Sequence, residues 1–291
     1  MRSETYSTPG SVLLNLDIPA GEIAIQTADT DETRVELAPG SDSESALEIV
    51  QSARIELLKR GDGHEVVVEV PTRSGISISF SRGPDVRFGT PELRLRVTCP
   101  RGAALDIRTK SADVEARGEY GAVEMKTASG DLEIDETTGS ARIKTASGDV
   151  QIERVGDALD VQSVSGDVDA GSVRGDVRAQ LVSGDVAVRD AGGSVNANTV
   201  SGDQRFEAVQ NGRVQLKAIS GNVTVGVRRG AQVYVDANTV SGSTESELEL
   251  GDAPGEDVPD TGRLVEILVK TVSGDVRIER APAPVELTDR P

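Results

Sequence analysis

Apolar and polar residues alternate with a period of two along most of this chain, and the alternation is interrupted at regular intervals. A period of two is typical of β-strands that turn one face to a core. In the middle of the chain each interruption carries a Ser-Gly-Asp tripeptide, and successive copies lie 18 residues apart. Counted from each Ser, apolar residues occupy positions +3, +5, +12 and +14. These residues are Val114, Leu132, Val150, Val168, Val186, Ala116, Ile134, Ile152, Ala170, Val188, Val123, Ala141, Leu159, Val177, Val195, Met125, Ile143, Val161, Ala179 and Ala197.

The repeat predicts two short strands and two corners in every rung. One corner carries Ser-Gly-Asp, and the other carries a Gly near position +10, where we expect the positive φ that a tight corner needs. We expect the apolar residue before each Ser, such as Val164 or Val182, to plug the corner from inside. A fixed period of this length indicates a stack of equivalent units. The predicted fold is all-β: a flattened single-stranded β-solenoid (β-helix) with two-strand rungs of about 18 residues and an irregular N-terminal capping region.

The same patterns predict a single solenoid domain over residues 11–280, after an N-terminal tail over 1–10 and before a disordered tail over 281–291. A short helix between Asp42 and Val50, with Asp42 or Ser43 as N-cap, would belong to the cap. The expected parts of the domain are irregular coils and cap over 11–110, regular rungs of 18 to 21 residues over 111–245, an inserted acidic loop over 246–264 and the last rung over 265–280.

Composition narrows the range of partners. The net charge is −18, so phosphate groups of nucleic acids would repel the chain, and we expect no nucleic-acid partner. The first residues carry no apolar signal segment, and no run of apolar residues is long enough to span a membrane. We therefore expect a cytoplasmic protein without membrane insertion, with leaderless export left open.

The corner residues form the first candidate site. Stacked rungs would place their aspartates in a row that could collect calcium, because Ca²⁺ prefers several oxygen ligands. The alternative, which we favour, is that each carboxylate accepts hydrogen bonds from backbone N–H groups at its own corner. The predicted structural turn ladder consists of Gly130, Asp131, Gly148, Asp149, Gly166, Asp167, Gly184, Asp185, Gly202 and Asp203.

A second candidate is the segment 72–91, where the alternation stops. It combines two of the three phenylalanines of the chain with three arginines and several glycines. Such a mixture is typical of a loop that anchors a partner, although the aromatic side chains could instead fold back over the core. The candidate partner-binding residues are Arg73, Phe80, Arg82, Arg87 and Phe88.

No catalytic motif is present in the sequence. The single histidine, His64, and the single cysteine, Cys99, lie in separate segments without a supporting pattern. Glycine-rich phosphate loops, metal-ligand helices and nucleophile elbows are absent from the sequence as well. We expect no enzyme activity, no cofactor and no metal site.

Three stretches of the sequence resemble a known family. They are Leu14 to Ile25, Val97 to Thr109, and the Lys-Thr-Ala-Ser-Gly-Asp units Lys126–Asp131 and Lys144–Asp149. Together they resemble the bacterial β-strand-repeat family labelled "putative adhesin", a domain of unknown function numbered 4097. The resemblance implies a β-solenoid without known enzymatic activity or cofactor, and adhesion or envelope-stress roles for some relatives.

The favoured hypothesis is a non-enzymatic scaffold that binds another, unidentified protein or a surface. One alternative is a self-assembling structural filament protein similar to bactofilins, and another is a β-helix enzyme that acts on polysaccharides. We expect a monomer, with end-to-end assembly as the alternative.

Overall fold

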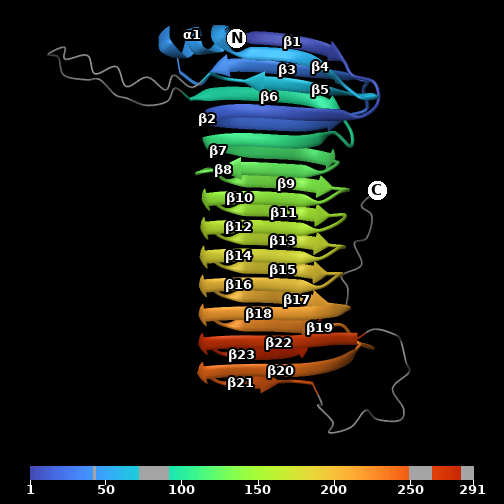
Figure 1. The fold of residues 1–291 in the computed structure, drawn as a ribbon, viewed down its shortest axis with the longest axis vertical. Coiled ribbons are helices and arrows are strands. Elements are labelled where there is room, and N and C mark those ends of the chain that lie inside the picture. Colours follow the sequence, from blue (N-terminus) through green and yellow to red (C-terminus); the bar gives the residue numbers. More distant parts are fainter. Residues whose placement is uncertain (42–43, 72–91, 249–263, 283–291) are drawn as a thin grey trace, which may run out of the picture. The chain divides into compact units, whose positions relative to one another are not determined.

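The structure is a computed structural model that describes residues 1–41, 44–71, 92–248 and 264–282. Contacts divide the chain into two compact units, Met1–Asp149 (unit 1) and Val150–Pro291 (unit 2). Each unit is built from parallel two-strand rungs, which confirms the β-solenoid fold (Figure 1). The single domain over 11–280 stays a prediction.

Unit 1 contains ten strands and one helix among its described residues. They are β1 (Arg2–Ser7), β2 (Val12–Ala28), β3 (Glu32–Pro39), α1 (Glu44–Ser52), β4 (Arg54–Arg60), β5 (Gly63–Glu69), β6 (Leu93–Pro100), β7 (Ala104–Tyr120), β8 (Val123–Thr127), β9 (Leu132–Thr137) and β10 (Ala141–Ser147).

The long strands β2 and β7 set the rung geometry of unit 1. Each has 17 residues, and they pair in parallel over nearly their whole length, from Leu13↔Ala104 to Gln26↔Arg117. The first half of β2 also pairs with β5, and its second half pairs with β6. One strand therefore serves both layers of a rung.

The N-terminal region departs from this parallel pattern, as expected for a cap. β1 pairs antiparallel with β3, β3 with β6, and β4 with β5. Residues 1–10, predicted to be a tail, contain β1, because its alternating pattern continues the sheet beside β3. The expected helix is present as α1, whereas Asp42 and Ser43 lie outside the described residues.

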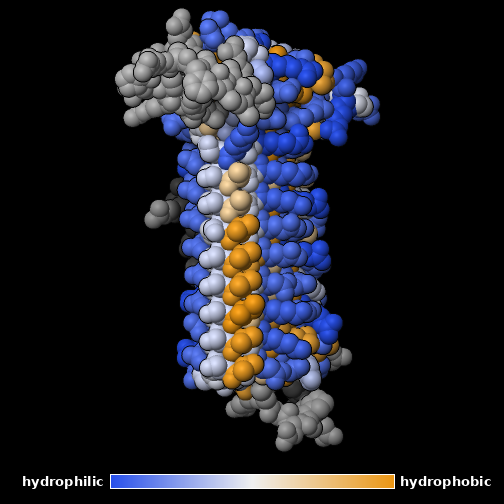
Figure 2. Space-filling model, turned by 60° about the vertical axis from the view of Figure 1, so that its left-hand side comes forward, coloured by the Kyte–Doolittle hydropathy of each residue, from blue (hydrophilic) through white to orange (hydrophobic). Residues whose placement is uncertain are grey.

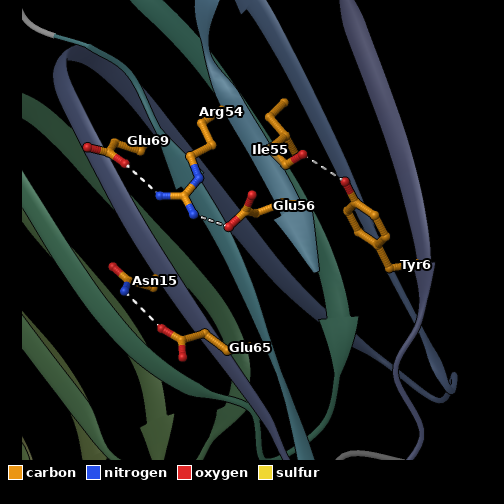
Figure 3. A network of polar contacts seen from close by, with 7 residues as sticks. All are labelled: Tyr6, Asn15, Arg54, Ile55, Glu56, Glu65 and Glu69. Carbon is orange, nitrogen blue, oxygen red and sulfur yellow. Dashed lines mark hydrogen bonds and ion pairs between the residues drawn. The ribbon is translucent and has the colours of Figure 1, made fainter. Parts of the chain in front are cut away.

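Polar contacts tie the capping strands together (Figure 3). The Tyr6 hydroxyl donates to the carbonyl of Ile55 at 3.0 Å, joining β1 to β4. Asn15 Nδ2 donates to Glu65 Oε1 at 3.0 Å, joining β2 to β5. These contacts link β1 to β4 and β2 to β5 by side chains.

Unit 2 contains thirteen strands among its described residues. They are β11 (Val150–Val155), β12 (Leu159–Ser165), β13 (Val168–Val173), β14 (Val177–Ser183), β15 (Val186–Ala191), β16 (Val195–Ser201), β17 (Gln204–Val209), β18 (Gly212–Ser220), β19 (Val223–Val227), β20 (Gln232–Ser241), β21 (Thr244–Ser246), β22 (Leu264–Ser273) and β23 (Val276–Arg280).

These strands form two layers of parallel ladders. In one layer the Ser that ends each strand pairs with the Ser that ends the next, as in Ser165↔Ser183 and Ser183↔Ser201. In the other layer Val168 pairs with Val186, again one repeat apart. From β11 to β17 the register of the ladders is therefore the 18-residue repeat itself.

The rung order in unit 2 differs from the order in the sequence. Ser273, at the end of β22, pairs with both Ser220 of β18 and Ser241 of β20. Residues 265–280, predicted to be the last rung, therefore lie between the rung of β18 and the rung of β20 (Figure 1). The predicted loop over 246–264 lies almost entirely outside the described residues.

The predicted inward positions form the core. All twenty residues at positions +3, +5, +12 and +14 of the five regular rungs are buried, with exposed fractions of 3% or less. The narrow interior is thus filled by small and branched aliphatic side chains, with Phe206 as a large exception that is fully buried.

The second corner uses its glycines for a reason other than the one expected. Positive φ angles occur at the Ser-Gly-Asp glycines, for example 133° at Gly184, but not at Gly121, Gly139, Gly175 or Gly193. At Gly121, Gly175 and Gly193 a Cβ would lie less than 3.0 Å from the preceding rung, for example 2.7 Å from the Gly175 carbonyl carbon in the case of Gly193, whereas at Gly139 the nearest approach is 3.1 Å. Space between rungs, not backbone conformation, therefore favours glycine at the first three positions.

Candidate functional site: an exposed apolar column

Six β-branched residues form a straight column on unit 2, one from each rung. Each lies directly before the Ser that ends its strand, and the Ser pairs fix the column in register. Exposed fractions range from 44% at Val200 to 82% at Val240 (Figure 2). In spatial order the apolar column consists of Val164, Val182, Val200, Ile219, Val272 and Val240.

This column corrects the expectation that these residues plug the corner from inside. Along a strand such as β14 the inward residues are Val177, Ala179 and Leu181, so alternation turns Val182 outward. The inward plug is the residue before it. In β12 that residue is Ser163, which is buried and donates from its hydroxyl to the Ser165 carbonyl at 3.0 Å.

On one side of the column the neighbouring outward residues are uncharged or basic, whereas on the other side the exposed corner aspartates, such as Asp167 and Asp185, follow three residues after the column. The outward residue two positions earlier on each strand is an amide or a lysine, without a carboxylate in any of the six rungs. These neighbours are Gln162, Gln180, Asn198, Lys217, Lys270 and Asn238. The column and its neighbours therefore make an apolar strip with hydrogen-bonding groups beside it.

The corner aspartates form a ladder of hydrogen bonds between rungs. Asp167 Oδ1 accepts from the backbone N–H of Asp185 at 2.8 Å, and Asp185 Oδ1 accepts from that of Asp203 at 2.7 Å. These bonds therefore reach the next rung. Turn chemistry had instead predicted bonds to N–H groups of the same corner. In unit 1, Asp131 Oδ1 accepts from the N–H of Asp149 in the same way at 2.9 Å.

The ladder continues to the end of unit 2 with other side chains. Asn222 replaces aspartate in one rung, and its Oδ1 accepts from the N–H of Asp275 at 3.0 Å. Asp275 Oδ1 in turn accepts from the N–H and the hydroxyl of Ser243, and these bonds, the backbone bond first, lower the pKa of the Asp275 carboxyl. Within the described ranges, no group of three or more His, Cys, Asp or Glu side chains could hold a metal ion.

The two candidate nucleophile–base residues lie on different strands. His64 is on β5 opposite Val12, and Cys99 is on β6 opposite Thr27. Cys99 is fully buried, and burial raises the pKa of its thiol to about 12. A thiol in this state is a poor nucleophile.

One open hollow lies on unit 1, with a volume of about 210 Å³. Its lining includes Arg96, Glu115 and Arg117, beside Ile25 and Gln26. Arg117 is paired with Glu115 and lies 3.7 Å from Glu133, so its charge is compensated locally. The hollow is shallow and half polar, unlike the enclosed apolar pockets that bind small molecules.

The loop candidates Arg73, Phe80, Arg82, Arg87 and Phe88 lie outside the described residues, so their role stays a prediction. The helix that the structure describes, α1, has nine residues, and within the described ranges no helix has the length and apolar character needed to cross a membrane.

Parallel two-strand rungs, an inter-rung aspartate ladder and a core of small aliphatic residues define a β-solenoid protein. The model of the Toastrack family, DUF4097, matches residues 20–279. The chain belongs to this family, as its repeat and the two motifs that precede the repeat predicted. No curated protein matches the chain.

Several solved structures are similar to the chain at low identity. One is described as a "putative cell adhesion protein" from Clostridium sporogenes, with 9% identity, a TM-score of 0.31, and coverage of 96% of this chain and 99% of that chain. A "putative adhesin" from Bacteroides fragilis has 8% identity, a TM-score of 0.36, and coverage of 95% and 96%. A third, a "putative adhesin" from Parabacteroides distasonis, has 10% identity, a TM-score of 0.33, and coverage of 95% and 96%.

Proposed function

We propose that this protein is a non-enzymatic scaffold that binds another protein along the apolar column of unit 2. The observation that carries the proposal is the column itself: six β-branched side chains in register, each about half exposed or more. Scattered exposed apolar residues are ordinary on protein surfaces, whereas a contiguous patch is characteristic of interaction sites.

The size of the column supports a binding role. Its exposed apolar surface is roughly 400–500 Å², the size of the largest patches on monomeric proteins. Removing this area from water would contribute about 10 kcal/mol before the costs of association are subtracted. Such a column can anchor a partner, and the adjacent amides of Gln180 and Asn198 can supply orienting hydrogen bonds.

The spacing of the column favours an amphipathic helix as the partner. Rungs repeat at about 4.8 Å, and an α-helix advances about 5.4 Å per turn. A helix laid along the column would place one apolar residue near each rung over several turns.

A capture experiment with matched variants tests the proposal. The double substitution Val182→Thr and Val200→Thr keeps β-branched shape but removes apolar surface, and Gln151→Thr with Asp169→Thr, at exposed positions of β11 and β13 in the other layer, is the control. We expect wild type and control to capture the same partner, identified and then purified, and the Thr variant to bind it at least tenfold more weakly, a loss of about 1.4 kcal/mol or more. A variant lacking residues 72–91 runs in parallel. Equal binding by the Thr variant, with loss in the deletion, would place the site in that segment instead.

A further inference from the structure

The strand β20 ends the stack of rungs in unit 2 and has an open backbone edge. It pairs with β22, and β21 pairs with β23, with no other ladder for either strand among the described residues of unit 2. Figure 1 shows β20 and β21 beyond β22 and β23, on the side away from β18. Among the described residues, nothing pairs with one edge of this ten-residue strand, and its N–H and C=O groups are available there.

The inward side chains of β20 are incompletely covered. Val233, Val235 and Ala237 are each half-buried. Their register partners on β22, which are Val265, Ile267 and Val269, are fully buried. The end of the core is thus exposed along the same strand that offers the free edge.

The sequence of β20 lacks the devices that usually protect an edge strand. Lysine, proline and inward-pointing charges prevent edge-to-edge pairing in natural sheets. From Gln232 to Ser241 the strand has one charged residue, Asp236, and neither lysine nor proline.

The capping strand of unit 1 is different. β1 carries Arg2 and Glu4, and the Arg2 guanidinium donates to the Ala53 carbonyl while the Tyr6 hydroxyl donates to that of Ile55. The chain thus protects one outer strand with side chains and leaves β20 open.

We propose that β20 joins two copies of this chain, with the two β20 strands pairing antiparallel about a twofold axis. A second copy is the occupant because the edge is self-complementary: in an antiparallel pair, residues directly opposite each other point to the same face. With Val235 opposite its own copy, Val233 faces Ala237, and Tyr234 faces Asp236. The two exposed core ends cover each other in this register, and the two Asp236 carboxylates do not meet.

The geometry also sets the strength and the size of the assembly. A ten-residue strand about 3.3 Å per residue long and about 10 Å deep has a footprint of roughly 300 Å² per copy. Stable dimers bury about 800 Å² per partner, so we expect a weak dimer that dissociates on dilution. Because a twofold pairing uses up the open edge of both copies, assembly stops at two and forms no filament.

Sedimentation velocity over a concentration series, from about 1 μM to about 1 mM, tests the proposal. Val235→Lys places a charge on the exposed core end, and Gln151→Lys places the same charge on an exposed outward position of β11, which does not pair with β20. We expect wild type and the Gln151 variant to pass from monomer to dimer as concentration rises, and the Val235 variant to stay monomeric. If the Val235 variant loses its β-sheet circular dichroism, Ala237→Lys takes its place.

Three outcomes would overturn the proposal. They are a wild type that stays monomeric at every concentration, a folded Val235 variant that dimerises like wild type, and growth beyond the dimer. The Val182→Thr/Val200→Thr variant is included as a further arm. If this variant lost self-association while the Val235 variant kept it, the apolar column, and not β20, would be the contact between copies.

Discussion

Substituting a glycine of a Ser-Gly-Asp corner should lower stability strongly, and two separate contributions to this loss can be measured. Gly202 has a φ of 139°, and a Cβ placed on it would lie 2.0 Å from the carbonyl oxygen of Gly184 in the preceding rung. Gly202→Ala therefore combines two penalties, an unfavourable backbone conformation and a steric overlap between rungs.

The magnitude follows from these two penalties. A non-glycine residue at positive φ costs about 1–2 kcal/mol. Relieving the overlap requires the two rungs to separate locally, which breaks ladder bonds such as Gly184 N–H to Ser201 O at 3.0 Å and Asp203 N–H to Asp185 Oδ1 at 2.7 Å. At about 1 kcal/mol for each bond and more for groups left unpaired, we expect Gly202→Ala to lower the free energy of unfolding by about 3–5 kcal/mol.

Two other glycines of unit 2 separate the penalties. Gly230 has a φ of 85° with open space around the added Cβ, so Gly230→Ala tests the conformational penalty alone. Gly171 lacks a positive φ, but its Cβ would lie 2.2 Å from the Glu153 carbonyl oxygen, so Gly171→Ala tests the overlap alone. Urea unfolding monitored by circular dichroism should rank Gly202→Ala as the most damaging. A loss no larger than that of Gly230→Ala would refute the argument that rung spacing forbids a Cβ.

Four further predictions concern titration, packing and metal binding. The hydrogen bonds from Ser243 lower the pKa of the Asp275 carboxyl, so the stability that the carboxylate contributes is present above the unfolded value near 3.8 and is lost as the pH falls below it. Asp275→Asn, which places the same side chain as Asn222 in the ladder, should therefore make the melting temperature decline less steeply in acid. An unchanged decline would contradict this. Burial raises the Cys99 pKa to about 12, so a thiol reagent at pH 8 should label Cys99 only after unfolding, and rapid labelling of the native protein would refute its burial. Tyr120 donates to the carbonyls of Ile25 and Arg117, both at 2.9 Å, so Tyr120→Phe should cost about 1–3 kcal/mol in urea unfolding, whereas a neutral substitution would show that water replaces the hydroxyl. Because the aspartate Oδ1 atoms already accept hydrogen bonds from N–H groups, neither calcium nor magnesium should change the melting temperature. A rise of several degrees with calcium alone would show that the ladder binds calcium.

Alternation alone was sufficient to predict which side chains form the core. The inward positions of the five regular rungs are buried without exception, because each repeat contains both strand faces in a fixed register. The apolar column was predictable by the same rule. In β14, Val177, Ala179 and Leu181 point inward, which leaves Val182 outward. The expectation of an inward plug was wrong because it followed the apolar character of Val182 and not its place in the alternation.

The second-corner glycines and the inter-rung aspartate bonds were harder to predict. Both depend on distances between neighbouring rungs, such as the 2.7 Å from a Cβ on Gly193 to Gly175, and a one-dimensional pattern contains no such distances. A short polar residue at a corner fits an intra-turn bond and an inter-rung bond equally well. Only the stacking geometry shows that Asp167 Oδ1 accepts from the N–H of Asp185 in the next rung.

The rung order in unit 2 follows from the chemistry of two rungs that share one pattern. At the inward positions of the rung of β22 and β23, Ile267, Val269, Val276 and Ile278 are buried, whereas the register partners of these residues in the rung of β20 and β21 are Val235, Ala237, Thr244 and Ser246. At the inward positions of this layer, Ile267 and Val269 of β22 together carry three more methyl or methylene groups than Val235 and Ala237 of β20. Burying β22 in the interior position instead of β20 is therefore favoured by about 2 kcal/mol. Because the cost of closing a loop grows slowly with its length, the separation of 32 positions between Ser241 and Ser273 allows either order. The more apolar rung therefore stacks on β18, and the rung with threonine and serine facing inward lies at the open end, where water can reach these hydroxyl groups.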